Sequence, residues 1–336
     1  MDAFLEEIQE HDLAPLWEVY QNIVGSEPSR SEDSMIWRWS EMLPLIEKSA
    51  ELVQGPDADH RVLILKNSRL NDRMATTTNI LAAFQCVNPG EATSPHRHTP
   101  AATRIIIEGS GGGTFVDGKR CDMFNGDLII TPNWTWHCHQ NDSGNRAIWL
   151  DVLDIPLVGS LDAVFGDMSM GPEDTFPMNI AQISDDSYLS GGLMPVTKLQ
   201  YVKHSPRLRY SFQDTLAALR NAPKSNDGIQ TINYTNPIDG SAILPTHDAK
   251  IFSLSKSIKT LETRSTANAV CIVIKGTGRS EIGGICHQWS SNDVFTIPHW
   301  SWTTHLAASE EAIIIEISDR QIMEKLNLYR REILED

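Results

Sequence analysis

The chain lacks the features that mark membrane, secreted and nucleic-acid-binding proteins. No apolar run among its 336 residues approaches the roughly 20 residues that cross a bilayer. Its first residues, MDAFLEEIQEHD, are acidic, whereas a signal peptide begins with basic residues and continues with apolar ones. Lysine and arginine number 28 against 44 aspartates and glutamates, so the net charge is −16. That balance argues against nucleic acid and anionic membranes as partners.

Cysteine is also scarce. The five cysteines are Cys86, Cys121, Cys138, Cys271 and Cys286, and no two of them form a C-x-x-C pair. An odd and scattered set favours reduced thiols over a disulfide framework. We therefore expect a soluble cytoplasmic protein. A hydrophobic content of 40% and a charged content of 21% are ordinary for a globular chain, and the length allows two domains.

Short β-rich runs fill two parts of the chain, from residue 61 to about residue 157 and from about residue 249 to residue 317. Glycine, proline and asparagine separate these runs, as they do in an antiparallel sandwich or barrel. Helical spacing of apolar residues is found in four other segments, which are 2–24, 37–46, 213–221 and 319–336. In the last segment Ile322, Leu326, Tyr329 and Ile333 fall on one helical face. The sequence therefore predicts an all-β protein with a helical N-terminal arm and a C-terminal helix.

The β-rich part of the chain repeats itself. Residues 107–111, IEGSG, correspond to residues 274–278, IKGTG, and PNWTW at 132–136 corresponds to PHWSW at 298–302. A repeat of this length predicts two barrels of the same design. The expected domains are a helical arm (1–60), a first jelly-roll barrel (61–158), a connector (159–245), a second jelly-roll barrel (246–318) and a C-terminal helix (319–336).

Three histidines of the first repeat have the spacing of a metal site. His96 and His98 lie two residues apart, so on a strand both imidazoles point to the same face. His137 follows a turn, an apolar run and a second turn, so a returning strand can bring it beside the pair. Three neutral imidazoles with open positions opposite suit Fe(II), although zinc also accepts three histidines and a water.

The second repeat lacks these ligands. Thr263, Ser265 and Thr303 stand at the three corresponding positions, and hydroxyl groups do not replace imidazoles around a transition metal of this kind. His299 and His305 remain in this half, and two isolated histidines indicate surface or core groups. The second barrel should therefore hold no metal.

Longer strings resemble a known family. His96-x-His98 between Gly90 and Gly109, and the later Gly126, Pro132, His137 and Asn141, resemble the two cupin motifs. HRHTPAATRIIIEG, GDLIITPNWTWHCH and WLDVLDIPLV are similar to gentisate 1,2-dioxygenase and its salicylate-cleaving relatives. Trp134 replaces a motif glycine, and Ala102 replaces the motif glutamate that this family also lacks. The resemblance runs from about Trp37 to the C-terminus. It implies a bicupin with Fe(II) on the three histidines, and a homo-oligomer with a tetramer favoured.

Two side chains are expected beside the metal from strand alternation. Arg104 lies six residues after His98 and so shares its face. We interpret it as a bidentate clamp on a substrate carboxylate, and the alternative is an ion pair with Glu108 or Asp127. His139 lies two residues after His137 and faces the same cavity. It is expected to exchange a proton with the substrate hydroxyl.

Other site residues are implied by the resemblance. Gln85 matches a substrate-contacting glutamine, with a hydrogen bond to the barrel wall as the alternative. Asp151 matches the aspartate of the family's WLD string, and either orients His139, receives a proton or makes a structural hydrogen bond. Arg61 is a second candidate for binding the substrate anion. Leu81 and Ala83 lie in ILAA where gentisate-cleaving members commonly read LWAG, so one pocket wall has lost an aromatic plane.

The resemblance implies an iron dioxygenase that inserts both atoms of O2 between the carboxyl-bearing and hydroxyl-bearing carbons of an ortho-hydroxybenzoate. Gentisate is the expected substrate, and salicylate, substituted salicylates and 1-hydroxy-2-naphthoate are the alternatives. A non-enzymatic bicupin that binds a small anion is a second hypothesis, which the complete histidine set disfavours. A manganese carboxylate decarboxylase is a third, which the missing motif glutamate disfavours.

Overall fold

The computed structural model describes the chain except residues 30–31, 71–72, 169–187, 189–202 and 335–336. The chain divides into two compact units, Met1–Arg30 and Ser31–Asp336. The first unit contains α1 (Asp2–Glu10) and α2 (Leu16–Ile23), neither of which buries a side chain within it. Pro15 precedes α2 and separates the two helices, because proline is tolerated at a helix start and not in its interior.

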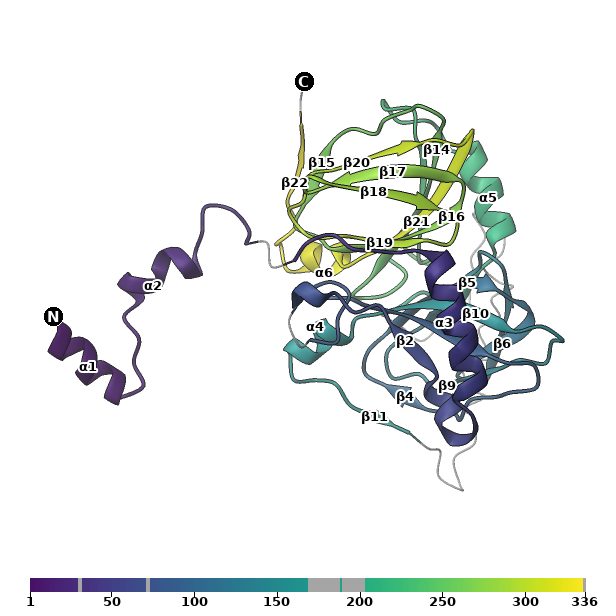
Figure 1. Ribbon diagram of the computed structural model, residues 1–336, viewed down its shortest axis with the longest axis horizontal. Coiled ribbons are helices and arrows are strands. Elements are labelled where there is room, and N and C mark those ends of the chain that lie inside the picture. Colours follow the sequence, from purple (N-terminus) through teal and green to yellow (C-terminus); the bar gives the residue numbers. More distant parts are fainter. Residues whose placement is uncertain (30–31, 71–72, 169–187, 189–202, 335–336) are drawn as a thin grey trace. The chain divides into compact units, whose positions relative to one another are not determined.

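The second unit contains two β-barrels, each built from a large and a small sheet (Figure 1). The large sheet of the first barrel has the order β12-β8-β5-β10-β3-β2. Its strands are β2 (Val62–Ile64), β3 (Leu81–Val87), β5 (Ala102–Glu108), β8 (Leu128–Thr131), β10 (Ala147–Leu153) and β12 (Arg209–Tyr210). The small sheet is β7-β6-β9, and a separate pair is β4-β11. Their strands are β4 (Arg97–His98), β6 (Ser110–Val116), β7 (Lys119–Phe124), β9 (His137–Gln140) and β11 (Gly166–Asp167).

The second barrel repeats this plan. Its large sheet, β1-β19-β16-β21-β14-β13, contains β1 (Ile36–Trp37), β13 (Gln230–Tyr234), β14 (Asp248–Ser255), β16 (Ala269–Lys275), β19 (Val294–Ile297) and β21 (Glu311–Ser318). Its small sheet, β18-β17-β20-β15-β22, contains β15 (Thr263–Ser265), β17 (Thr277–Ile282), β18 (Ile285–Ser290), β20 (Thr303–Ala307) and β22 (Arg331–Ile333). The α-helices in the described ranges of this unit are α3 (Trp39–Leu52), α4 (Ile155–Ser160), α5 (Phe212–Asn221) and α6 (Arg320–Lys325).

One hydrophobic core joins the two large sheets. It contains Phe84 and Leu150 from the first barrel together with Ile272 and Ile315 from the second. In a strand alternate residues face opposite sides, so the remaining residues of β3, β5 and β10 face the interior of the first barrel. Several of these inward residues are polar, and they form the candidate site described below.

The repeat extends to backbone conformation. Trp134 and Trp300 both have a positive φ, 61° and 55°, at the position where the cupin motif has glycine. An arginine stacks on each ring, Arg97 at 4.5 Å from Trp134 and Arg264 at 4.3 Å from Trp300. The predicted two-barrel fold is confirmed. The turns at Trp134 and Trp300 show that the two barrels also share backbone conformation.

Three segments differ from the expected domain plan. The C-terminal helix α6 ends at Lys325 and does not continue to residue 336, because Asn327 has a φ of 57° and β22 then pairs with β15. Ile36–Trp37 of the arm pairs with β19 in the second barrel. The connector supplies β12 to the first barrel and β13 to the second.

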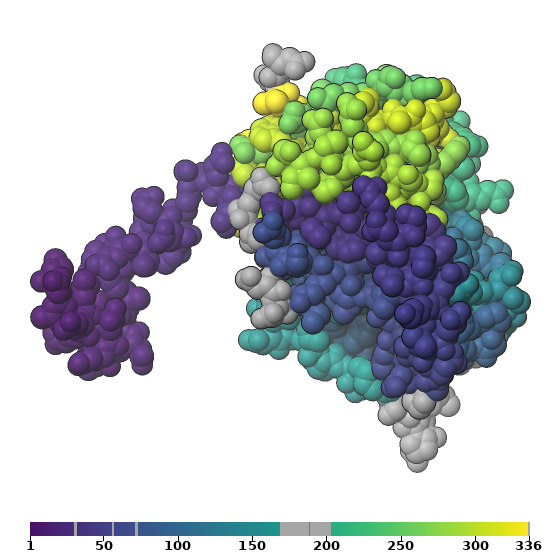
Figure 2. Space-filling view, in the orientation of Figure 1, coloured from purple at the N-terminus to yellow at the C-terminus, as the bar shows by residue number. Residues whose placement is uncertain are grey.

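The segment from Met35 to Leu52 links the two barrels on one face. β1 is hydrogen-bonded to β19, and Trp39, in the first turn of α3, packs edge-on against Phe84 with ring centroids 5.7 Å apart. Figure 2 shows this dark purple segment lying across the boundary between the green second barrel and the blue first barrel. None of the helices in the described ranges combines the length and the apolar character that a bilayer span requires.

Candidate metal centre and active site

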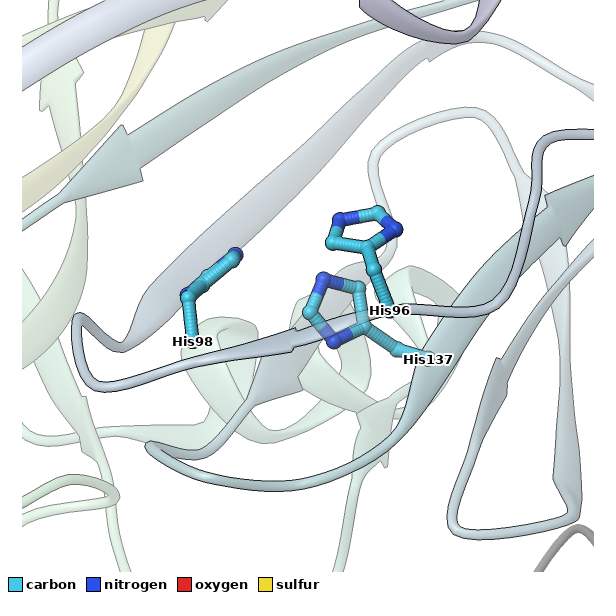
Figure 3. A group of neighbouring side chains, drawn as sticks. All are labelled: His96, His98 and His137. Carbon is cyan, nitrogen blue, oxygen red and sulfur yellow. The ribbon is translucent and has the colours of Figure 1, made fainter. Parts of the chain in front are cut away.

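The three predicted ligand histidines lie together in the first barrel (Figure 3). His98 belongs to β4, His96 precedes it, and His137 opens β9. His96 and His137 form an antiparallel bridge in which each backbone N–H donates to the other's carbonyl, at 3.0 and 2.8 Å. One potential ligand atom from each histidine lies within 4.8 Å of the other two. Strand pairing thus brings together residues 39 to 41 positions apart, counted from the sequence.

Backbone carbonyls orient all three rings. His96 Nδ1 lies 2.9 Å from Ser94 O, His98 Nδ1 lies 2.7 Å from Pro100 O, and His137 Nδ1 lies 2.9 Å from Thr135 O. A carbonyl oxygen only accepts a hydrogen bond, so Nδ1 must carry the proton in each ring. The lone pair of each Nε2 is therefore free for a metal. This carbonyl support is a common way to fix a metal-binding histidine.

Burial keeps these imidazoles neutral. It lowers the pKa of His96, of His98 and, most strongly, of His137 below the ordinary histidine value. His137 is lowered further by its two neighbours, since a second positive charge beside the first is unfavourable. Neutral imidazole is the form that binds metal. The donor set therefore fits a divalent transition metal with three nitrogen ligands.

Arg104 and Asp151 form a buried ion pair next to this cluster. They lie directly opposite one another on β5 and β10, with Arg104 Nε 2.8 Å from Asp151 Oδ1. The two atoms are close without being aligned for a hydrogen bond, so the contact is ionic. Trp149 Nε1 donates to Asp151 Oδ2 at 2.7 Å. Asp151 therefore holds Arg104, and no hydrogen bond joins it to His139 in the described structure.

The alternative partners proposed for Arg104 were wrong. Glu108 lies at the end of β5 and forms no ion pair with it among the described residues. Asp127 is buried and pairs instead with Arg209, whose Nε lies 2.7 Å from its Oδ2. The side chain of Arg104 is only 3% exposed. It is an interior cation, and not part of the surface.

His139 faces the interior beside Arg104. Its Nδ1 lies 3.1 Å from Thr114 Oγ1, and Arg104 Nη1 donates to the same hydroxyl at 3.2 Å. Burial, followed by the charge of Arg104, lowers the pKa of His139 well below the ordinary value. Thr114 thus links the two residues. The sequence did not single it out, because one threonine in the glycine-rich run 110–116 carries no recognisable signal.

Leu81, Ala83 and Gln85 lie on the same face of β3. Gln85 is opposite Trp149 in the pairing of β3 with β10, and Ala83 is opposite Asp151. All three side chains are buried. The Gln85 side chain donates a long 3.5 Å hydrogen bond to Asp59 O, in the segment that precedes β2. These residues therefore form one wall beside the ion pair.

Arg61 does not join this site, and its expected contact with substrate is corrected. Its guanidinium forms an ion pair with Glu91 and donates to the backbone carbonyls of Val53 and Cys86. The side chain is 1% exposed. With its hydrogen-bonding groups engaged in this way, Arg61 has a structural role.

The paired barrels and the three-histidine cluster define the chain as a bicupin with a site suited to a metal ion. The cupin domain model matches residues 83–153, which span the ligands and the ion pair.

Relatives make the assignment narrower. The chain is 35% identical to gentisate 1,2 dioxygenase 1 of Aquipseudomonas alcaligenes, over 97% of this chain and 94% of the relative. It is 34% identical to 5-aminosalicylate 1,2-dioxygenase of Comamonas sp, over 99% and 90%. A crystal structure of the salicylate 1,2-dioxygenase adduct with gentisate, from Pseudoaminobacter salicylatoxidans, matches with a TM-score of 0.91 at 28% identity, over 100% of this chain and 94% of that one. The chain belongs to the gentisate 1,2-dioxygenase family of ring-cleaving dioxygenases.

Proposed function

We propose that the protein is an Fe(II)-dependent dioxygenase that cleaves the ring of an ortho-hydroxybenzoate, with gentisate as the leading substrate. Both atoms of O2 enter between the carbon that carries the carboxylate and the carbon that carries the hydroxyl. One observation carries the proposal. In a chain of this family, three imidazoles, each with one potential ligand atom within 4.8 Å of the other two, stand beside a buried arginine.

Iron is preferred to zinc for two reasons. Three ligands on one face with open positions opposite resemble the facial arrangement of non-haem iron oxygenases. The relatives of this chain carry the name dioxygenase, and O2 chemistry needs a redox-active metal. His96, His98 and His137 would hold the ion. When bound, it would supply adjacent open positions at which the hydroxy acid and O2 meet.

Arg104 is proposed to bind the substrate carboxylate. Asp151 and Thr114 engage Nε and Nη1, and the guanidinium has further N–H groups on its remaining nitrogen and on Nη1. An anion that approaches this side receives charge-assisted hydrogen bonds in a site from which water is largely excluded. Asp151 also keeps the planar group in a fixed orientation, so less side-chain entropy is lost when substrate binds.

His139 is proposed to accept the proton of the substrate hydroxyl. When its Nδ1–H donates to Thr114 Oγ1, the lone pair of Nε2 is left for this task. In the free protein the charge of Arg104 lowers the pKa of His139 and opposes protonation. A bound carboxylate would neutralise that charge, so the imidazole becomes a stronger base when the substrate is present. Loss of the hydroxyl proton makes the ring electron-rich.

The wall formed by Leu81, Ala83 and Gln85 is proposed to select the ring. Leucine replaces the tryptophan that gentisate-cleaving members commonly have, so the wall lacks one aromatic plane. A ring with a substituent, or a second fused ring, therefore finds more room at this position. Salicylate, substituted salicylates and 1-hydroxy-2-naphthoate remain the alternative substrates.

The test uses protein loaded with Fe(II) under anaerobic conditions and mixed separately with gentisate and each alternative substrate. Oxygen is then admitted. We expect uptake of one O2 per substrate and a ring-opened chromophore with at least one member of the panel. An absence of both signals across the whole panel would overturn the proposed function. Elemental analysis of the purified protein distinguishes iron from zinc and manganese.

Two further expectations are testable by simple measurements. The family resemblance implies a homo-oligomer, with a tetramer favoured, and light scattering would give the mass of the particle. The five cysteines are free thiols in the structure, as expected for a cytoplasmic protein. Cell fractionation would test that location.

A further inference from the structure

The interior of the second barrel contains a cavity of about 510 Å³. Residues of β13, β14, β15 and β20 line it, at the upper barrel of Figure 1. Thr263 and Thr303 pair across β15 and β20, as His96 and His137 pair in the first barrel. The cavity therefore includes the position that a metal would occupy if the second barrel had kept its ligands.

The lining is charged, and most of its charges are paired. Arg264 pairs with Glu332 and stacks on Trp300, and Arg320 pairs with Asp248. Lys250 pairs with Glu316 and also borders the cavity. Its ammonium is therefore the group of the lining considered below as a partner for a small anion.

Lys250 is the central cation. Its Nζ lies 2.8 Å from Glu316 Oε1, and the two residues lie opposite one another on β14 and β21. In the same register of the first barrel, Ala83 lies opposite Asp151. The second barrel thus has a cation where the first has a small wall residue.

The ammonium of Lys250 has donors to spare. The Lys250 side chain lies inside the barrel, yet 38% of its surface is exposed. This exposed surface borders the cavity. Burial opposes its charge, but the Glu316 carboxylate outweighs this effect and raises the pKa of Lys250. An ammonium has three N–H donors, and Glu316 accepts from one. The remaining donors can reach a ligand in the cavity.

Hydroxyl groups and apolar surface complete the lining. Within the described part of the chain, the hydroxyls of Thr263 and Ser265 donate to no protein acceptor, so both remain available to a ligand. Phe252 and Ile297 provide apolar surface in the same cavity. A pocket of a few hundred cubic ångströms with apolar walls and a few polar groups is typical of a small-molecule site.

We propose that the second barrel binds a small organic carboxylate without a metal. The carboxylate accepts hydrogen bonds from Lys250 and from the hydroxyls of Thr263 and Ser265. The carbon part of the ligand packs against Phe252 and Ile297. This site goes beyond the proposed dioxygenase activity, which belongs to the first barrel.

Benzoate is the probe, and benzyl alcohol is its neutral counterpart of similar size. Both are titrated calorimetrically into the full-length variant His137→Ala/Arg104→Met/Asp151→Asn, in which the first barrel has lost a metal ligand and the proposed carboxylate clamp. We expect benzoate to bind, and benzyl alcohol to bind at least about tenfold more weakly, because the alcohol carries no charge. A crystal soaked in 4-bromobenzoate should show bromine in the second barrel.

Substitutions at Lys250 test where the carboxylate of benzoate binds. Lys250→Met alone leaves Glu316 without its partner and can unfold the barrel, so the double variant Lys250→Met/Glu316→Gln is used as well. Both should weaken benzoate at least about tenfold. Lys275→Met is the matched control, because it removes an exposed lysine of the same barrel, paired with Glu311 at 2.7 Å. It should leave benzoate binding unchanged.

Three results would overturn the proposal. The first is an absence of benzoate binding up to a benzoate concentration of about 10 mM, because a Kd above this value corresponds to negligible affinity. The second is equal affinity for benzyl alcohol, which would indicate a site for neutral ligands. The third is bromine density in the first barrel and none in the second. Oxygen uptake by the metal-loaded parent protein is measured separately, so failure of either proposal is distinguishable from failure of the other.

Discussion

At the scale of single residues, His137 occupies the centre of the histidine cluster. Its ring centroid lies 4.3 Å from that of His96 and 4.8 Å from that of His98. We expect His137→Ala to abolish oxygen uptake and to reduce bound iron towards zero, because two imidazoles do not retain a labile ferrous ion. Iron is counted by elemental analysis after desalting. His305→Ala, in the second barrel, is the control and should leave the iron content unchanged.

Substitution of Arg104 should weaken the binding of substrate without affecting the binding of metal. Arg104→Met should keep the iron and raise the KM for the hydroxy acid, since the guanidinium contacts the carboxylate and not the metal. It should also lower the free energy of unfolding by about 3–5 kcal/mol, because Asp151 is left buried without its cationic partner.

The double variant Arg104→Met/Asp151→Asn provides the matching control. It removes both charges, so we expect it to regain most of the stability without regaining affinity for substrate. Urea unfolding and steady-state kinetics give the two readouts. If affinity returned together with stability, the carboxylate clamp would have no support.

His305 should make stability depend on pH. Burial, followed by the charge of Lys250, lowers its pKa from 6.5 to about 3. Between these values the unfolded chain binds a proton that the folded chain does not, so stability is lost as the pH falls below 6.5. From pH 7 to pH 5 this residue should cost about 2 kcal/mol.

The test compares the parent with His305→Asn, which keeps a hydrogen-bonding group near Ser280. Urea unfolding at pH 7 and pH 5 should show a loss smaller by about 2 kcal/mol in the variant. The other histidines titrate alike in both proteins, and their effect cancels in the difference. Equal losses would mean that His305 does not resist protonation in the folded state.

At the scale of elements, Arg61 ties the end of α3 to the first barrel. Its guanidinium joins Val53 O, at the C-terminus of the helix, to Cys86 O on β3 and to Glu91. Arg61→Met should lower the free energy of unfolding by about 1–3 kcal/mol, because Glu91 and the carbonyls of Cys86 and Val53 lose a charged donor. Oxygen uptake per folded molecule should persist, since Arg61 lies outside the proposed site. A selective rise in KM with unchanged stability would restore its role as a substrate contact.

The elements also show what can be predicted from sequence. Alternation along one strand correctly placed His96 beside His98, and helical spacing predicted α5, because both patterns are local. The ion pair of Arg104 with Asp151 was missed, since it depends on the register between two strands far apart in sequence. The long C-terminal helix was wrong for a related reason. Pairing of β22 with β15 overrides the helical spacing of residues 326–333.

At the scale of the whole molecule, both barrels depend on one shared core. This core contains Phe84 and Leu150 from the first barrel and Ile272 and Ile315 from the second. If the barrels were separated, each large sheet would expose a large apolar face to water, which is unfavourable. The second barrel therefore contributes to the first even without a metal. Its interior is free to change, because the shared core lies on the opposite face of its large sheet.

The matched register of Thr263 with Thr303 makes the second barrel a scaffold for protein design. Histidines introduced there would start from the same strand pairing as His96 and His137. We expect Thr263→His/Ser265→His/Thr303→His to bind a second metal ion per chain, while the parent binds one. Equilibrium dialysis with Fe(II) or Zn(II) would give the stoichiometry, and a value that stays at one would show that register alone does not build the site. Success would give one chain with two independently adjustable metal centres.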